Sequence, residues 1–341
     1  MNGTSQGVFR HVEDVKLDLE GLTVLPGMVN AHDHLEFALF PRLGCGPYAN
    51  AAEWAQDIYQ PEEPPVRDHL RVPKTLRLLW GGLRNLASGV TTVSHHNPYE
   101  PLFDNDFPVR VVKTYGWAHS LAFSPDVAER FAATPPAAPF LIHLAEGTDR
   151  DSASEVFRLH EMGALTARTV LIHAVGLDAD GWRLVRESGA GVVWCPRSNR
   201  FTLGRTISPG AIPQGIPMAL GTDSALTAEG DLLDEIRLGG TCEMVTFTSR
   251  RILRVALHRD DWIAAPAFGE PPELVVIGGR IHLISPRLAD ALPAARRNEF
   301  FPMRISGRPE VLLRWNVPQL IAATRKYLDA PLRLAGREVA A

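Results

Sequence analysis

The stretch VLPGMVNAHDH, residues 24–34, decides the fold. It is an apolar run with β-branched residues that ends on His32 and His34, and such runs are typical of buried strands. In an extended strand residues i and i+2 point to one side, so both imidazoles can face one metal ion. Because short motifs also match by chance, the interpretation of H-x-H depends on how the other strands of the chain end.

Apolar runs of the same kind recur along the chain, with amphipathic stretches between them. The runs are 22–30, 89–96, 109–123, 140–145, 169–174, 191–196 and 216–223. Alternating strands and helices predict parallel strands joined by right-handed crossovers. Seven or eight such units over about 230 residues match a (β/α)8 TIM-type barrel. A doubly wound open sheet is the alternative, but no G-x-G-x-x-G follows the first strand.

The predicted barrel is irregular in its middle. Only 46 residues separate His96 from His143, and two complete β/α units of about 30 residues each need more. We therefore expect a distorted or incomplete barrel around residues 97–139, with a small, reduced accessory β-sheet from the chain ends. The predicted regions are the barrel (22–250), the accessory β region (1–21 and 251–290) and a C-terminal helical segment (291–341).

Composition limits the classes of partner. The 341 residues carry a net charge of -4, so there is no excess of cations for a nucleic acid polymer. No run of about 18 apolar residues appears and the N-terminus lacks a signal-peptide pattern, so we expect a cytoplasmic protein without a membrane partner. Three cysteines, far apart and odd in number, predict no disulfide framework.

Other strands also end on metal-ligating side chains. His143 ends FLIH, His173 ends VLIH and Asp223 ends MALGTD. Active sites of (β/α)8 barrels lie at the carboxyl ends of the strands, where these residues would meet His32 and His34. A histidine packed in the core would explain any one of them. It does not easily explain the whole set.

The set resembles the amidohydrolase superfamily, in its cytosine deaminase and triazine hydrolase branch. The similarity runs in order from about Leu22 to Arg237 through VLPGMVNAHDH, GVTTV, HLAE, VLIHAVGL, WCPRSN, LGTDSAL and GDLLDEIR. It implies a distorted barrel holding one divalent metal ion, Zn²⁺ or alternatively Fe²⁺, and a hydrolytic deamination or related displacement. It also implies His32, His34, His143 and Asp223 as metal ligands, His173 beside the metal's water and Glu146 as proton shuttle.

The chemistry of these residue types fits that assignment. A divalent ion lowers the pKa of a bound water to roughly 7. Asp223 would accept the water proton, and His173 would stabilise the hydroxide and the developing tetrahedral centre. Glu146 would protonate a ring nitrogen and then the departing amine. No lysine in a matching strand position is a candidate to bridge two metals, so a single ion is expected.

Further residues are candidates for substrate binding. His119 in WAHSLAFSPD resembles a substrate-contacting histidine of nucleoside-type deaminases in this branch, and Trp117 could stack on a flat ring. His95 and His96 end the second strand, and which of them faces the pocket depends on the strand register. Arg197, Ser198 and Asn199 after WCP are interpreted as loop-shaping.

Three functions compete at this point. The leading hypothesis is hydrolytic deamination of a small amino-substituted nitrogen heterocycle by a metal-activated water. The second is hydrolysis of an acyclic C–N bond in an amide, ureido or formimino group, and the third is a non-catalytic metal-binding relative. Glu146 and Asp223 argue against the third, since a purely structural site needs no proton shuttle. The compressed barrel wall also predicts a homo-oligomer, because it should leave apolar surface uncovered.

Overall fold

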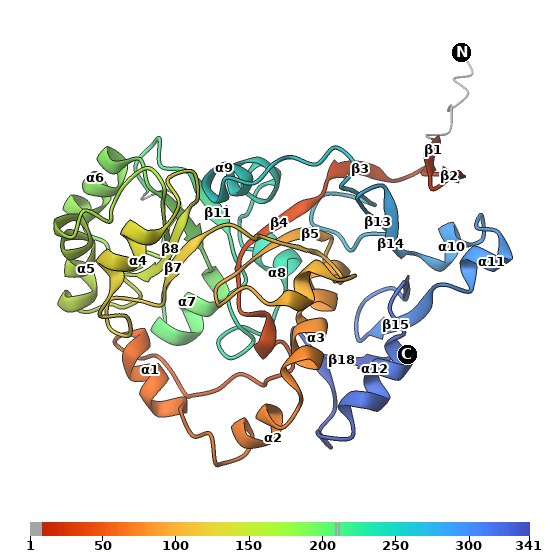
Figure 1. Ribbon diagram of the computed structural model, residues 1–341, viewed down its shortest axis with the longest axis horizontal. Coiled ribbons are helices and arrows are strands. Elements are labelled where there is room, and N and C mark those ends of the chain that lie inside the picture. The colour runs from red at the N-terminus through yellow and green to blue at the C-terminus, as the bar shows by residue number, and fades with distance from the viewer. Residues whose placement is uncertain (1–8, 209, 211) are drawn as a thin grey trace.

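A computed structural model of the chain describes residues 9–208, 210 and 212–341. Eight parallel strands follow one another in chain order in two arcs (Figure 1). The first arc contains β4 (Met28–Asp33), β5 (Val90–His95) and β6 (Arg110–Val111), and the second contains β7 (Gly116–Ala118), β8 (Phe140–Leu144), β9 (Thr169–His173), β10 (Gly191–Trp194) and β11 (Met218–Leu220). The N–H groups of Thr222 and Asp223 donate to the His32 carbonyl, which joins the ends of β11 and β4. The prediction of a (β/α)8-type barrel is confirmed.

Seven apolar runs give eight barrel strands because one run contains two of them. Residues 109–123 form both β6 and β7, and the exposed Lys113 and Thr114 lie in the connection. The run at 22–30 divides in a different way, since Gly27 separates β4 from a strand of the accessory sheet. A Cβ atom on Gly27 would lie 2.2 Å from Oγ1 of Thr91, so only glycine lets the chain pass there.

The barrel is irregular where the chain is compressed, as predicted. A 3-10 helix (Pro101–Asp104) replaces the helix after β5, and the described residues between β6 and β7 form no helix. The next helix, α4 (Val127–Ala133), has only 7 residues. Longer helices return after β8, β9 and β10, which are longer than β6 and β7. The other α-helices are α1 (Ala51–Ile58), α2 (Val66–Leu70), α3 (Lys74–Ala87), α5 (Arg150–Glu161), α6 (Ala179–Ser188), α7 (Pro196–Leu203), α8 (Leu232–Ile236), α9 (Ser249–Leu253), α10 (Pro286–Ala289), α11 (Ala294–Arg297) and α12 (Val317–Thr324).

Local sequence explains why these helices form where they do. In α5 the side chain of Asp149 accepts from the Ser152 N–H and caps the first turn. Ser152, Val156 and Leu159 are buried at a spacing of one and two helical turns, so α5 turns one face toward the barrel. The same pattern of cap and apolar face recurs in α6, where Asp178 accepts from the Gly181 N–H.

The chain ends build an antiparallel sheet beside the barrel, coloured blue except for one strand (Figure 1). Its strands are β3 (Thr23–Pro26), β12 (Trp262–Ala265), β13 (Leu274–Ile277), β14 (Arg280–Ile284), β15 (Phe301–Ile305), β16 (Val311–Leu313), β17 (Arg333–Leu334) and β18 (Arg337–Ala340). The expected helical segment 291–341 thus contributes four short strands as well as α11 and α12. Strands of two to five residues are too short to show a clear period of two. β1 (Phe9–Val12) and β2 (Val15–Asp18) form a separate hairpin, and residues 1–8 of the predicted accessory region lie outside the described residues.

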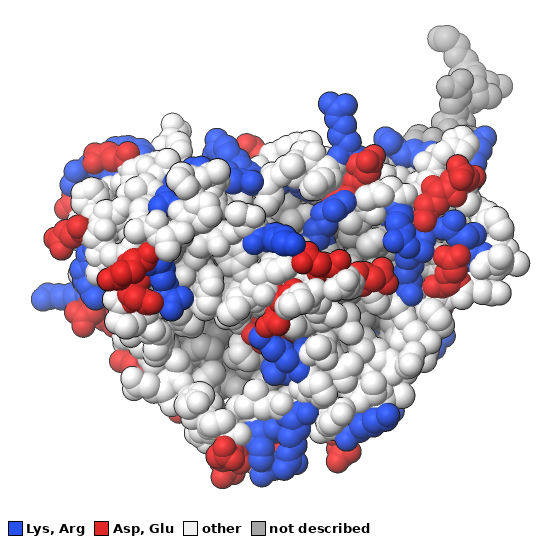
Figure 2. All heavy atoms as spheres, viewed as in Figure 1, with Lys and Arg blue, Asp and Glu red and all other residues white. Residues whose placement is uncertain are grey.

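Acidic and basic side chains are interspersed over the face of the molecule in Figure 2, without a continuous basic field. Among the described residues, no helix combines the length and the apolar character that crossing a lipid bilayer requires.

Candidate active site

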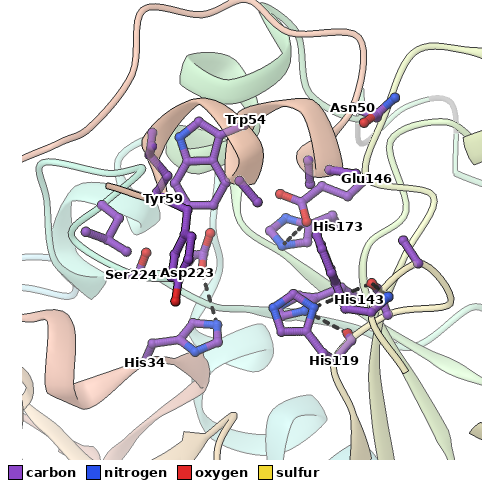
Figure 3. A pocket seen from close by; sticks show the side chains of 18 of the residues that line it. His34, Asn50, Trp54, Tyr59, His119, His143, Glu146, His173, Asp223 and Ser224 are labelled. Atoms are coloured by element: carbon purple, nitrogen blue, oxygen red, sulfur yellow. Dashed lines mark hydrogen bonds and ion pairs between the residues drawn. The ribbon is translucent and has the colours of Figure 1, made fainter. Parts of the chain in front are cut away.

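The carboxyl ends of four strands bring metal-ligating atoms together at the floor of one cavity. Ligand atoms of His32, His143, His173 and Asp223 all lie within 4.8 Å of one another, and all four residues are buried. Nε2 of His32 is 3.2 Å from Nε2 of His143 and 3.3 Å from Oδ1 of Asp223. Figure 3 shows several of these side chains pointing into the cavity.

The protonation states of this cluster suit a divalent cation. Burial and the neighbouring imidazoles hold the pKa values of His34 and His143 well below 6.5, so both present neutral nitrogens. Burial alone would raise the pKa of Asp223, but the hydrogen bond with His32 and the electrostatic interactions with His173, His32 and His34 hold it well below 3.8. Neutral imidazoles with one carboxylate are a donor set that zinc prefers, so these residues fit a single ion.

His143 is oriented for this task by its backbone surroundings. Its Nδ1 donates to the carbonyl oxygen of His119 at 2.9 Å, which leaves the lone pair of Nε2 directed at the cluster. His34, an expected ligand, lies at the edge of the group, with Nε2 3.6 Å from Oδ1 of Asp223. The tight group contains His173 instead, which the sequence placed beside the metal's water.

His173 is held by Asn199 of α7. Nδ1 of His173 donates to Oδ1 of Asn199 at 2.7 Å, and Nδ2 of Asn199 donates to Oγ1 of Thr206 at 3.1 Å. The same hydroxyl accepts from Nε1 of Trp194, so the amide turns its oxygen toward the imidazole. Burial lowers the pKa of His173 to about 4, and its Nε2 therefore faces the cavity as an acceptor.

Glu146 is the second carboxyl group of the site, and its environment is opposite to that of Asp223. Its Oε2 lies 3.4 Å from Nε2 of His173. Burial, the Asp223 charge and the Glu155 charge raise its pKa well above 4.5, so it holds a proton. The carbonyl of Glu146 accepts from the N–H of Ala51, which ties the loop after β8 to the first turn of α1.

A buried ion pair behind the metal cluster is the main feature that the sequence did not reveal. Asp33 lies between the two histidines of H-x-H and points to the opposite side, where Nη2 of Arg84 donates to its Oδ1 at 2.7 Å. The same Nη2 donates to Oγ1 of Thr222 and to the carbonyl of Asp223 at 3.1 Å. Arg84 is 2% exposed. The period of two in β4 predicts that Asp33 faces away from His32, but only the packing of α3 brings Arg84 to it.

α7 also holds the ligand carboxylate. Ser198 donates to Oδ2 of Asp223 at 2.6 Å, and Thr227 donates to the same oxygen at 2.9 Å. The loop-shaping residues Ser198 and Asn199 therefore contact two residues of the metal cluster, which is a closer involvement than the sequence suggested. Glu235 in α8 accepts from the Arg197 N–H at the start of α7. Nε and Nη2 of Arg197 both donate to the carbonyl of Glu229, which lies between β11 and α8.

The expected substrate contacts separate into one residue inside the cavity and three outside it. His119 lines the cavity, next to the metal cluster. Trp117 does not line it, because its ring packs on His96 and under Arg130. His96 is fully buried beside the rings of the cluster and donates through Nε2 to the Ala118 carbonyl.

His95 faces away from the cavity. Its Nδ1 accepts from the Leu35 N–H, its Nε2 lies 3.6 Å from Oε2 of Glu36, and its ring packs on Phe103. The prediction of a substrate contact in the cavity is therefore corrected for Trp117, His95 and His96. The reason is the register: β5 and β7 turn these three side chains into the core or onto the outer surface.

The cavity above the cluster has a volume of about 640 Å³, within the usual range for small-molecule sites. Its floor contains His34, His119, His143, His173, Glu146 and Asp223. Its walls come from α1, α2, α5 and the loop around residues 120–123.

Known proteins share this sequence pattern and this fold. No family model matches the chain. A 5-methylthioadenosine/S-adenosylhomocysteine deaminase of Syntrophobacter fumaroxidans is 26% identical over 81% of the chain and 73% of its own length. A deaminase of the same name from Halobacterium salinarum is 25% identical over 66% of the chain and 63% of its own length. The chain therefore spans between about two thirds and three quarters of these relatives.

Solved structures share this fold. A triazine hydrolase variant superposes with a TM-score of 0.67 over 90% of this chain and 88% of that one, at 16% identity. An adenosine deaminase from Xanthomonas campestris with bound zinc superposes with a TM-score of 0.62 over 90% and 85%, at 15% identity. The resemblance to the metal-dependent aminohydrolase branch of the amidohydrolase superfamily is thus confirmed in sequence and in fold.

Proposed function

We propose that this protein is a metal-dependent deaminase that hydrolyses the ring amino group of an aminopurine nucleoside. The observation that carries the proposal is the pair Glu146 and Asp223, two carboxyl groups at one cavity floor whose pKa values are displaced in opposite directions. Such a pair supplies an acid and a base at the same pH. The sequence relatives named as deaminases of adenine nucleosides support the substrate class.

The ion would be held by His32, His34, His143 and Asp223, with His173 beside it. We propose zinc, because an adenosine deaminase and an atrazine chlorohydrolase with this fold were solved with zinc. When bound, a divalent ion supplies Lewis acidity that lowers the pKa of water to roughly 7.

The residues of the chain then divide the proton transfers. Asp223, as a carboxylate, accepts a proton from the attacking water, and Nε2 of His173 orients that water as a hydrogen-bond acceptor. Glu146, as a neutral acid, donates its proton to the ring nitrogen beside the reacting carbon. The water oxygen bonds to that carbon, and Glu146, now a carboxylate, carries the remaining hydroxyl proton to the amino group. The C–N bond then breaks, the amine leaves as ammonia, and the proton held by Asp223 returns to Glu146. The products are one ammonia and one ring carbonyl for each water consumed.

Ammonia release tests this proposal directly. The zinc-loaded protein is given adenine nucleosides, pterins, amino-triazines and, in parallel, amides, ureas and formimino compounds. We expect ammonia from the adenine nucleosides, together with the ultraviolet change that accompanies conversion of the amino ring to the oxo ring. Turnover confined to the acyclic compounds would transfer the assignment to acyclic C–N hydrolysis, and binding of zinc without any turnover would favour a non-catalytic relative.

Self-association, also expected from the sequence, stays a prediction. Sedimentation velocity over a range of protein concentrations checks it, and a concentration-independent monomer contradicts it.

A further inference from the structure

Two arginines of the accessory region reach across to α8 of the barrel, and neither belongs to the proposed proton transfers. Nη1 of Arg308, in the turn between β15 and β16, lies 2.6 Å from Oδ2 of Asp231. Nη1 and Nη2 of Arg337, the first residue of β18, donate to Oδ2 and Oδ1 of Asp234 at 2.9 and 2.8 Å. Asp231 is the N-cap of α8 and Asp234 is its third residue, so both arginines hold the start of one helix.

These ion pairs are shielded from water. The side chains of Arg308 and Asp231 are each 6% exposed, and that of Asp234 is 8% exposed. Burial alone would raise the pKa of Asp234, but the hydrogen bonds from Arg337 and from the Asp231 N–H hold it below 3.8. A bidentate pair between a guanidinium and a carboxylate is geometrically specific. The accessory sheet therefore sets where α8 begins.

Helix α8 in turn carries Glu235, a buried carboxyl group that faces the start of α7. Oε2 of Glu235 accepts from the N–H of Arg197 at 3.2 Å, and Glu235 has no exposed surface. The first N–H groups of a helix have no acceptor within that helix. Among the described residues, the side chain of Cys195, the N-cap of α7, accepts none of them. Glu235 therefore supplies an acceptor from the neighbouring helix and ties α7 to α8.

Helix α7 orients two groups of the metal cluster. Its Ser198 donates to Oδ2 of Asp223 at 2.6 Å, and its Asn199 accepts from Nδ1 of His173 at 2.7 Å. Hydrogen bonds weaken steeply as their angle departs from linear, so a tilt of α7 would disturb both contacts. Printed contacts thus run without a break from the accessory sheet, through two helices, to the metal cluster.

We propose that Arg308 and Arg337 are positioning residues for the deamination, which act on the metal cluster through α8 and α7. The ion pairs place α8, Glu235 places α7, and α7 orients Asp223 and His173. The proposal rests on the proposed function for the reaction, but its effect on the metal cluster needs no substrate. A merely structural ion pair would change the free energy of unfolding and leave the folded site as it is.

The variant Arg308→Ala tests the first step, with Arg304→Ala as the matched control. Arg304 lies in β15, next to the same turn, and its pair with Glu310 is exposed. In the zinc-loaded protein we expect Arg308→Ala to lower kcat for an adenine nucleoside about tenfold with little change in KM, because misplaced groups lose interactions made in the transition state. Arg304→Ala should keep both constants. A parental kcat in Arg308→Ala, or a loss confined to KM, overturns the proposal.

Glu235 tests the second step, because its acceptor can be kept or removed at nearly constant volume. Burial raises the pKa of Glu235 well above 4.5, so Glu235→Gln resembles its protonated form and still accepts from the Arg197 N–H. Glu235→Met removes the acceptor and should lower kcat about tenfold, whereas Glu235→Gln should keep it. Adding Arg308→Ala to Glu235→Met should lower kcat no further, since both changes act along one path. Additive losses in the double variant would show that the arginine does not act through Glu235, and the proposal would be wrong.

Metal binding separates this inference from the proposed function. Zinc affinity is measured by chelator competition, and Co²⁺ replaces zinc because its visible absorption reports the geometry of its ligands. Both measurements use protein that circular dichroism shows to be folded. Arg308→Ala and Glu235→Met should raise the zinc dissociation constant about tenfold and change the cobalt spectrum, whereas Arg304→Ala and Glu235→Gln should match the parent.

The two proposals fail in different ways. No turnover of any nucleoside by the parent refutes the proposed function alone. Parental zinc affinity and cobalt spectra in Arg308→Ala and Glu235→Met overturn the inference whatever the turnover. If Arg308→Ala does not fold, Glu235→Met decides by itself, because it leaves both ion pairs of the accessory sheet in place.

Discussion

Glu146 and Asp223 lie in one cavity but in different electrostatic environments. The imidazoles around Asp223 stabilise its ionised form, whereas burial and the charges of Asp223 and Glu155 stabilise the protonated form of Glu146. At the residue scale the site is therefore an acid and a base that burial and neighbours separate. We infer from that difference that Asp223 binds the metal ion and acts as the base, and that Glu146 acts as the acid.

Replacement of Glu146 by Gln should separate chemistry from metal binding. Gln keeps the volume and hydrogen-bonding reach but cannot donate a proton at neutral pH, so turnover should fall by about 10²-fold or more. Zinc content by elemental analysis should match the parent. Glu161→Gln, at the exposed end of α5, is the control. Unchanged turnover in Glu146→Gln would show that this carboxyl group takes no part in the reaction.

The ion pair Asp33–Arg84 should position the metal ligands. Arg84→Met removes the bond to the Asp223 carbonyl, and we expect the zinc dissociation constant, measured by chelator competition, to rise roughly 10- to 100-fold. It also leaves Asp33 buried without its cation, at a cost of about 3–5 kcal/mol. The double variant Asp33→Asn/Arg84→Met removes both charges and should regain stability but not zinc affinity. A double variant with parental affinity would mean that the pair does not position the ligands.

Glu155 should make stability depend on pH. Burial raises its pKa to about 7 from an ordinary 4.5, despite the bond from the Ala145 N–H and the Arg158 charge. Below pH 4.5 the folded and unfolded chains both hold the proton. Between pH 4.5 and 7 the unfolded chain loses it first, so stability falls as pH rises.

Glu155→Gln keeps an acceptor for the Ala145 N–H and cannot ionise. In metal-free protein the free energy of unfolding of this variant, relative to the parent, should therefore be higher at pH 8 than at pH 5, by up to about 3 kcal/mol. The difference in Tm between variant and parent at the two pH values measures the effect. A difference in Tm that does not change with pH would contradict the assignment.

At the scale of elements, the barrel joins a regular half to a compressed one. β8 and β9 each have five buried residues and pair along their whole length, whereas β6 and β7 have two and three residues. The connection between β6 and β7 has exposed side chains and contains no helix that would cover it. The irregular wall nevertheless positions His119, which follows β7 directly.

Hydrogen exchange should reveal this asymmetry. Local opening costs least where few buried contacts and few ladder bonds hold a segment. We expect amides of β6 and β7 to exchange at least about tenfold faster than those of β8 and β9 in the metal-free protein. Mass spectrometry of peptic fragments measures the exchange. Equal protection across all four strands would mean that the compressed half is as stable as the regular one.

At the scale of the whole molecule, the metal site links strands from both arcs of the barrel. Ligands from β4, β8 and β11 lie far apart in the sequence, so ion binding favours the closed barrel over any open form. We expect one zinc ion per chain. The free energy of unfolding should rise by about 4 kcal/mol when free zinc is 1,000-fold above its dissociation constant. The variant His32→Ala/His34→Ala should lose both the zinc and the gain in Tm. A stoichiometry near two would contradict the single-ion site.

The sequence by itself determined the strand ends and the chemistry that they carry. Residues such as His143 and Asp223 follow apolar runs directly, and in a parallel barrel all such ends meet at one rim. The amidohydrolase resemblance and the compressed segment were predictable for the same reason, because they depend on residue order and chain length alone.

Only the tertiary structure decided which side chains reach the cavity and what supports them. The register of the strands turned His95, His96 and Trp117 away from the cavity. A shift of one residue moves a side chain to the opposite face of a strand, and the local sequence does not specify the register. Arg84 reaches Asp33 across 51 residues and α1 reaches the Glu146 loop, because helices pack where the barrel leaves room. Such long-range contacts depend on the relative placement of whole elements, and no local pattern in the sequence encodes it.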